Sequence, residues 1–236
     1  FIVNTFARES DYRGNLIAEI IESLLNIFVN IYFFKIIFLN TNAIAGWNSE
    51  EMLVLVAVTQ IITSIIYMLF MNNLPRIQTY VLRGDFDYIL LKPCSSQFYV
   101  SLRYFYFGAV PSVIFSFALL IYALFHVGAK ITVVKAIIFF IDIVAAIVIC
   151  YSIWFLIMIL SIIFIKIGAM HELFLSALKF LEYPQNIYKG MIRILMIYII
   201  PLATVSNVPA EKLLGKVGMI DTIEIVLLSI VFFMLT

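Results

Sequence analysis

Long runs of apolar residues, each bounded by a cluster of polar positions, divide this chain of 236 residues. A helix needs about 20 residues to cross a hydrocarbon core of about 30 Å. The runs lack the alternation of barrel strands, and a helix satisfies its own backbone polar groups in lipid. The pattern therefore predicts an all-α membrane protein with six spans, at residues 15–39, 50–71, 103–126, 135–165, 190–206 and 219–236.

Composition agrees with this pattern and excludes a water-soluble fold. Hydrophobic residues make up 64% of the chain and charged residues 12%, with a mean hydropathy of +1.12, whereas soluble domains have about 25% charged residues. The net charge of +1 argues against a nucleic-acid partner, because phosphate binding needs clustered Lys and Arg. The chain starts at Phe1 and ends inside an apolar run, so we expect the natural protein to extend at both ends.

One polar stretch, residues 72–102, connects the second and third predicted spans and contains "LPRIQTYVLRGDFDYILLKP". Pro75 suits the first turn of a helix and Gly84 suits its left-handed end, which predicts a short amphipathic helix between them. Asp85 can cap a second short helix that Pro93 ends. The stretch either lies on lipid headgroups or forms a rigid unit that docks into a partner's groove.

Lys and Arg beside the span ends indicate the orientation of the chain, because they are enriched on the cytoplasmic side. Ten fall on the side of the polar stretch and five on the other, which predicts a cytoplasmic N-terminus. The ten are Arg8, Arg13, Arg76, Arg83, Lys92, Arg103, Lys166, Lys179, Lys189 and Arg193.

Polar residues inside the predicted spans are candidates for function, because burying them in lipid is costly without partners. Four of them form one stripe on the first span, within an arc of about 80° at 100° per residue. The stripe either makes ordinary interhelical hydrogen bonds or lines a translocation path or a seam with a second permease. It consists of Glu19, Glu22, Asn26 and Asn30.

Three further acidic residues lie in or beside later spans. Asp142 needs a partner inside the fourth span, either Lys135 one helical repeat away or a group on another helix. Asp221 and Glu224 begin the sixth span, and their candidate partners are the lysines at 212 and 216.

No enzymatic or metal site is predicted in this chain. Gly215-Lys216 is followed by Val217 rather than Ser or Thr, so the phosphate-binding loop of ATPases is missing. His171-Glu172 resembles the start of a zinc site, but the second histidine position holds Leu175.

Two stretches resemble bacterial ABC type-2 exporter permeases. "VLRGDFDYILLKPCSSQFYVSLRYF", residues 81–105, is similar to the family's cytoplasmic segment before the third span. "IRILMIYIIPLATVSNVPAEKLLG", residues 192–215, is similar to its fifth span. The resemblance implies six helices, an N-terminal elbow helix at 1–14, a coupling helix within 72–102 and outer re-entrant helices at 201–218 in the bacterial cytoplasmic membrane.

The resemblance also implies partners and roles. A second permease, identical or related, and two copies of a cytosolic ATPase that binds ATP and Mg would complete the transporter. Pro201 and Pro209 would belong to an outer gate. ATPase coupling would fall on residues of the polar stretch, namely Leu74, Arg76, Ile77, Tyr80, Val81, Arg83, Gly84, Asp85 and Asp87.

The sequence therefore predicts the permease subunit of an ATP-driven exporter of an amphipathic lipid, drug or peptide. An ion-coupled secondary transporter or channel is the alternative, and it would use Glu19, Glu22, Asp142, Asp221 or Glu224 as carriers. A third possibility is a membrane anchor that has no transport role of its own.

Overall fold

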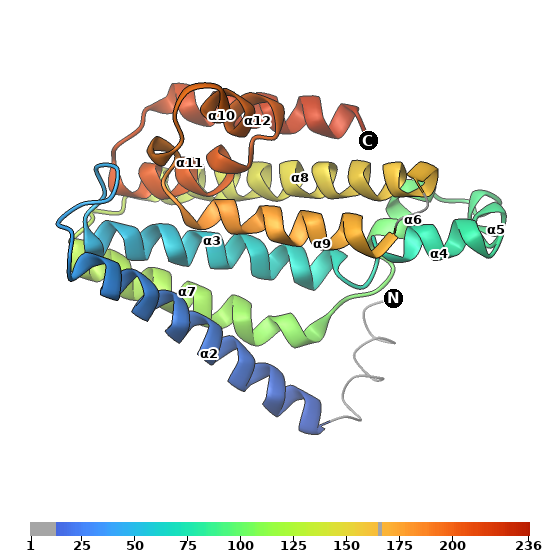
Figure 1. The fold of residues 1–236 in the computed structure, drawn as a ribbon, viewed down its shortest axis with the longest axis horizontal. Helices are drawn as coiled ribbons and strands as arrows, with labels where there is room; N and C mark the ends of the chain where they lie inside the picture. The colour runs from blue at the N-terminus through green and yellow to red at the C-terminus, as the bar shows by residue number, and fades with distance from the viewer. Residues whose placement is uncertain (1–12, 165–166) are drawn as a thin grey trace.

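The computed structural model describes residues 13–164 and 167–236 and shows a bundle of long helices lying side by side (Figure 1). The long helices are α2 (Arg13–Phe38), α3 (Ser49–Phe70), α7 (Val110–Val127) and α8 (Val133–Phe164). The predicted elbow helix lies outside the described residues, apart from its last two positions, which belong to α2.

Helix α3 forms the centre of the bundle and packs against α2, α7, α8 and α11 (Leu202–Leu214). Its start is fixed by a capping box: Asn48 Oδ1 accepts from the Glu51 N–H at 2.8 Å, and Glu51 Oε2 accepts from the Asn48 N–H at 3.0 Å. The most apolar part of α3 is 61% buried, whereas that of α2 is only 11% buried. Helix α2 therefore covers one edge of the bundle and leaves most of its own surface open.

Three short helices project at one end of the bundle, on the right in Figure 1. They are α4 (Arg76–Leu82), α5 (Phe86–Leu90) and α6 (Ser96–Leu102). The first two are the predicted pair, and Gly84 between them has the expected left-handed conformation with φ of 74°. Asp85 stands at the N-cap of α5, but its side chain makes no capping hydrogen bond there.

Helix α6 was not predicted, and it delays the start of the third span. Residues 103–106 are not helical, and the span begins with the 3₁₀ turn η1 (Phe107–Ala109) before α7. The third span therefore covers Phe107–Val127 instead of 103–126.

Helix α8 is followed by a helix that returns along the bundle. The 32 residues of α8 extend about 48 Å, longer than the hydrocarbon core. Helix α9 (Ile167–Leu178) runs back beside α8 (Figure 1) and continues into the 3₁₀ turns η2 (Lys179–Glu182) and η3 (Gln185–Ile187). Thr59 Oγ1, midway along α3, donates to the Leu181 carbonyl at 2.9 Å, which holds η2 against the bundle.

The predicted fifth span is not one continuous helix. Helix α10 (Gly190–Ile194) continues as the π-helical turn η4 (Leu195–Ile199), and the axis then bends by 81° into α11. The bend falls at Pro201, which has no N–H to donate and disfavours helical geometry at the residue before it. Ile200 accordingly leaves the helical region, with φ of −129° and ψ of 78°.

Six spans are not confirmed. Among the described residues, four helices are long and apolar enough to cross a membrane, or five if the bent α10–α11 pair counts as one span. Helix α12 (Met219–Met234) has 16 residues, which is about 24 Å and shorter than a hydrocarbon core of about 30 Å.

The return of α9 also changes where two of the basic residues used to predict the orientation lie. Helix α10, which contains Arg193 and follows Lys189 at its N-cap, lies in the half of the molecule away from α4–α6 (Figure 1). Lys189 and Arg193, two of the ten basic residues that the prediction counted on the α4–α6 side, therefore lie in the other half of the described part of the chain.

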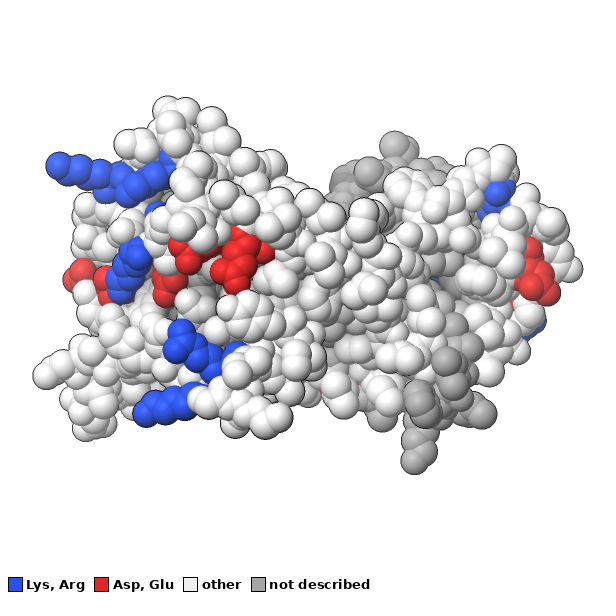
Figure 2. All heavy atoms as spheres, turned by 90° about the horizontal axis from the view of Figure 1, so that it is seen from above, with Lys and Arg blue, Asp and Glu red and all other residues white. Residues whose placement is uncertain are grey.

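Charged side chains gather at both ends of the face that Figure 2 shows, with an almost uncharged band between them. This distribution is typical of a protein whose middle lies in hydrocarbon, where charged groups are costly.

Asn73 fastens the short helices to the end of α3. Its Nδ2 donates to the Leu69 carbonyl at 2.7 Å and to the Tyr104 carbonyl, and its Oδ1 accepts from the Tyr104 N–H at 2.8 Å. The Tyr106 N–H donates to the Met68 carbonyl at 2.9 Å. The residues before α4 and the residues after α6 are thus both held at the end of α3.

We expect Asn73→Ala to lower the free energy of unfolding by about 2–3 kcal/mol, because it leaves backbone groups of a partly buried segment without partners. Thermal unfolding in mild detergent measures the loss. Asn72→Ala, at the half-buried neighbouring position, is the matched control and should change stability by under about 1 kcal/mol. Equal losses in the two variants would contradict the anchoring role of Asn73.

Candidate functional site

The polar stripe of α2 meets polar side chains of α3 and of the segment that begins α7. Tyr106 Oη donates to Glu19 Oε1 at 3.1 Å, and the hydroxyls of Ser23 and Ser112 are 2.6 Å apart. Glu19 is only 8% exposed and Ser23 only 6%. The inward side of α2 is therefore joined to α7 by hydrogen bonds in a region that the sequence assigns to the membrane.

These three elements enclose a cavity of about 110 Å³, which we call the α2–α3–α7 cavity. Ten of the thirteen described residues that line it have polar side chains, and none of the thirteen is Lys, Arg or His. Helix α3 contributes Gln60, Thr63, Ser64 and Tyr67. Their spacing of three, one and three places them on one face of a helix, a signal in the sequence that could have identified this second polar face.

Gly108 permits the close approach of α2 to η1. A Cβ added at this position would collide with the carboxylate of Glu19. A larger residue at this position would therefore push the carboxylate of Glu19 aside.

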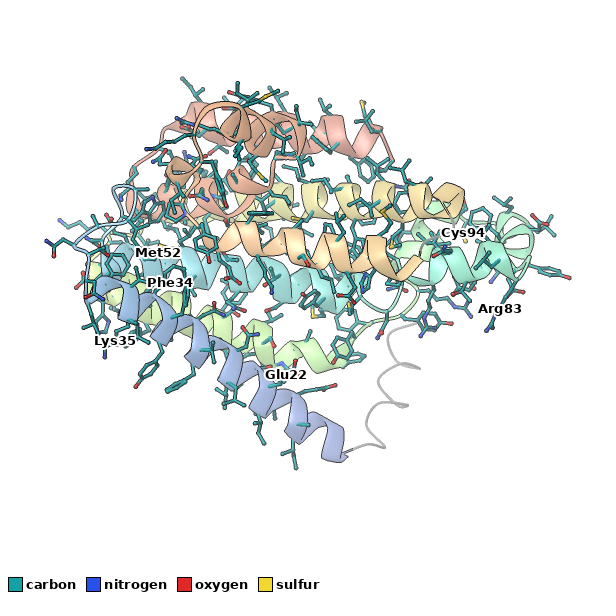
Figure 3. The ribbon with its side chains drawn as sticks, in the orientation of Figure 1. Glu22, Phe34, Lys35, Met52, Arg83 and Cys94 are labelled. Carbon is teal, nitrogen blue, oxygen red and sulfur yellow. The ribbon has the colours of Figure 1, made fainter. Side chains whose placement is uncertain are left out.

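The predicted stripe does not face one environment along its whole length. Glu19 is buried, Glu22 and Asn26 are exposed, and Asn30 is half-buried. Asn26 Oδ1 accepts from Gln60 Nε2 at 3.1 Å and from Asn30 Nδ2 at 2.9 Å. The stripe starts inside the bundle and continues onto the open surface of α2, where Figure 3 labels Glu22.

The residues predicted for ATPase coupling divide into a buried base and an exposed tip. Leu74 and Ile77 are buried and cannot touch a partner, Tyr80 and Val81 are half-buried, and Arg76 is exposed near the base. The remaining four, Arg83, Gly84, Asp85 and Asp87, are exposed, and Figure 3 labels Arg83 among the short helices at this end of the molecule.

Basic side chains stacked on tyrosine rings support this tip. The Arg76 guanidinium lies 4.4 Å from the ring centre of Tyr104, and Lys92 Nζ lies 3.8 Å from that of Tyr99. Each such cation–π contact contributes about 0.5–1 kcal/mol at an exposed site. Tyr88 and Leu91 are also exposed on the tip, and sequence reasoning had not singled them out.

A second polar cluster lies at the opposite end, between α8, α11 and α12. Asp142 is fully buried, and neither carboxylate oxygen has a hydrogen-bond partner among the described residues. The basic group nearby is Lys212 of α11, a group on another helix, which was the second of the two expected alternatives. Lys212 is itself 5% exposed, and its Nζ donates to the Gly218 carbonyl. A buried acid of α8 and a buried base of α11 therefore lie where these two helices pack together.

The other expected charge partners at this end differ from the prediction. Asp221 Oδ2 accepts from the Gly218 N–H at 3.0 Å. Lys216 Nζ forms an ion pair with Glu51 Oε2 at 2.7 Å and lies 4.7 Å from the ring centre of Trp47. The lysine at 216 therefore joins the end of α11 to the start of α3.

Within the described residues, no group of three His, Cys, Asp or Glu side chains is arranged to hold a metal ion.

Comparison with known proteins identifies the family of this chain. Residues 24–236 match the family model described as ABC-2 family transporter protein. The chain belongs to this family. No curated protein and no solved structure gives a significant match.

Family membership makes this ABC-2 protein the membrane component of a transporter and implies an ABC ATPase as its partner. Such membrane components are typically non-catalytic. The match covers the second polar cluster and the α4–α5 tip, whereas Glu19, Glu22 and Ser23 of the first cluster lie just before its start.

We expect Lys212→Met to lower the free energy of unfolding by about 3 kcal/mol, because it leaves Asp142 buried without an opposite charge. Lys216→Met, which removes a partly exposed ion pair, is the matched control and should cost about 1 kcal/mol or less. Chemical or thermal unfolding in mild detergent gives both values.

The double variant Asp142→Asn/Lys212→Met separates pairing from packing. If the two groups act on each other, its loss is smaller than the sum of the two single losses. Additive losses, or equal effects of the two lysine variants, would contradict the pairing.

Proposed function

We propose that this ABC-2 protein is the permease of an ATP-driven exporter, with its α4–α6 end in the cytoplasm. The observation that supports this best is the exposed α4–α5 tip. The tip exposes the charged residues Arg83, Asp85 and Asp87, and its base is buried in the bundle. A partner subunit that binds these charges can therefore transmit a movement to the helices beneath them.

The coupling step follows from how the tip is attached. Leu74 and Ile77 anchor its base, Asn73 joins it to α3, and α4 packs on α8. When ATP closes a pair of bound ATPase subunits, displacement of the tip reaches two long helices at once. The bundle then changes the side to which its path opens.

The translocation path is assigned to the polar stripe of α2 and to a neighbouring permease, identical or related. Glu22 and Asn26 lie on the open side of α2, where facing hydrocarbon alone is unfavourable. A second permease against this side would cover them. The apolar side chains between them favour an amphipathic substrate: a lipid, drug or peptide.

The outer gate is assigned to the bent pair α10–α11. Pro201 makes the bend and Pro209 lies inside α11, where it removes one backbone hydrogen bond. Nearly all of α11 is buried against α3 and α8. The segment is short, bent and buried, and it lies at the end away from the tip. These properties favour a re-entrant segment that closes the translocation path at that end.

The test is ATP hydrolysis by the complex purified from its own cells in mild detergent. Intact-mass measurement should give two permeases and two ATPases. Replacing Arg83, Asp85 and Asp87 together with Ala should lower ATPase association or transport-coupled hydrolysis at least about tenfold, which corresponds to about 1.4 kcal/mol.

The matched control replaces with Ala two exposed charges away from the tip, Glu50 in the first turn of α3 and Lys130 in the loop after α7, and should retain both properties. Transport in vesicles that follows a proton or sodium gradient without ATP would refute the exporter and favour the ion-coupled carrier.

A further inference from the structure

We propose that the base of the α4–α5 tip binds the phosphate of an anionic phospholipid. The site is the basic ladder, which we define as Arg76, Lys92 and Arg103 together with the rings of Tyr99 and Tyr104 between them. This inference goes beyond the proposed function and does not depend on ATP coupling, because it assigns a lipid to the base of the tip. Three observations carry it: the arrangement of the basic groups, their charge balance and the level at which they lie.

The basic side chains and the tyrosine rings of the ladder alternate. The Arg103 guanidinium stands in the middle, 4.9 Å from the ring centre of Tyr104 and 5.0 Å from that of Tyr99. The Arg76 guanidinium lies 4.4 Å from the same Tyr104 ring, and Lys92 Nζ lies 3.8 Å from the Tyr99 ring. Three cationic groups are therefore gathered around two rings, close enough for the oxygens of one phosphate to accept hydrogen bonds from more than one of them.

Tyr80 of α4 shows that the two guanidiniums act at one place. Burial is the main cause that raises the pKa of Tyr80, and Tyr104 beside it raises that pKa further, whereas Arg103 and Arg76 both lower it. The two arginines lie at opposite ends of the short-helix segment. They meet because Asn73, at the end of α3, holds the Tyr104 backbone.

No carboxylate balances the ladder in the described part of the chain. The ion pair that the structure shows there joins Lys216 to Glu51 at the other end of the bundle, and Asp85 and Asp87 of the tip form none with the ladder. Within residues 13–164 and 167–236 the ladder is therefore a cationic site. A phosphate supplies the opposite charge, and its oxygens match the paired N–H groups of a guanidinium.

The ladder lies where two membrane spans end. Arg103 and Tyr104 come just before the span that begins at Phe107, and Arg76 follows soon after the span that ends at Phe70. Groups at this level meet lipid headgroups, where tyrosine rings and basic side chains are favourable and where anionic lipids attract Arg and Lys.

Helix α6 exposes apolar side chains beside the ladder. Phe98 is 57% exposed and Leu102 is 39% exposed. Each comes one residue before a member of the ladder, Tyr99 or Arg103, which places the apolar and the basic sides about 100° apart around the helix axis. A helix with two such sides suits the boundary between headgroups and hydrocarbon. These features favour a phosphate that carries acyl chains over a soluble one.

A bound lipid would fix the base of the tip to the headgroup layer. Arg76 begins α4 and Arg103 follows α6, so one phosphate between them joins both ends of the short-helix segment. The exposed charges of Arg83, Asp85 and Asp87 are not used by the lipid and stay available to a partner subunit.

The experiment is native mass spectrometry of the permease–ATPase complex, purified from its own cells in mild detergent and washed to remove bound lipid. The complex is titrated with dioleoylphosphatidylglycerol. Dioleoylphosphatidylcholine, which has the same chains and no net charge, is the matched probe. We expect the first phosphatidylglycerol to bind at least about tenfold more tightly than the first phosphatidylcholine. Equal affinities of the two lipids would overturn the proposal.

Variants locate the bound lipid. Arg76→Gln/Arg103→Gln should weaken phosphatidylglycerol binding at least about tenfold, and the milder Lys92→Gln, which tests the same site if the double variant does not fold, at least about threefold. Lys130→Gln/Lys135→Gln, which removes two basic groups at the opposite end, is the matched control and should change this binding less than about twofold. Binding that no ladder variant changes, or that the control weakens equally, would refute the site.

Two further arms separate the lipid from other sources of negative charge. Glycerol 3-phosphate, a soluble phosphate without acyl chains, should not displace the lipid at millimolar concentration. Displacement would assign the ladder to a soluble phosphate and overturn the lipid proposal. Loss of the ATPase from the double arginine variant, with phosphatidylglycerol binding unchanged, would assign the ladder to the ATPase interface and overturn it as well.

Discussion

Polar side chains that lie at membrane depth must find partners inside the protein, because hydrocarbon offers none. In this bundle that requirement determines which helices meet. Glu19 and Ser23 are satisfied by Tyr106 and Ser112, which draws α2 against the start of α7. Asn26 takes its hydrogen bond from Gln60 of α3. Helix α2, which leaves most of its surface open, is thus held to the bundle by hydrogen bonds as well as by packing.

The same requirement operates at the other end with charges in place of amides and hydroxyls. Asp142 and Lys212 are both buried, and each makes the removal of the other costly. Because α11 follows a bend of 81° at Pro201, its attachment to α8 limits how that bent pair can move. The two polar clusters lie in opposite halves of the bundle, which suits a path that opens at one end at a time.

The α4–α5 tip differs from both clusters because its charges face outward. The tip is held in place at its base. Asn73 accepts a hydrogen bond from the Tyr104 backbone, and Arg76 and Lys92 make cation–π contacts with tyrosine rings. Exposed charges contribute little to stability but give a partner something specific to bind. The residues that hold the tip in place are therefore at its base, and the charged residues that a partner could bind are exposed.

The class of the protein, the first four apolar segments, the pair of short helices around Gly84 and the polar stripe of α2 could all be predicted from the sequence. These follow from local rules: span length, helix-breaking residues and a period of 3.6. Only the folded arrangement shows that Gln60 and Ser112 meet the stripe, that Lys212 of α11 is the basic group that acts on Asp142, and that α9 returns along α8. Those outcomes depend on which helices touch, and contacts between residues far apart in the chain leave no local pattern to read.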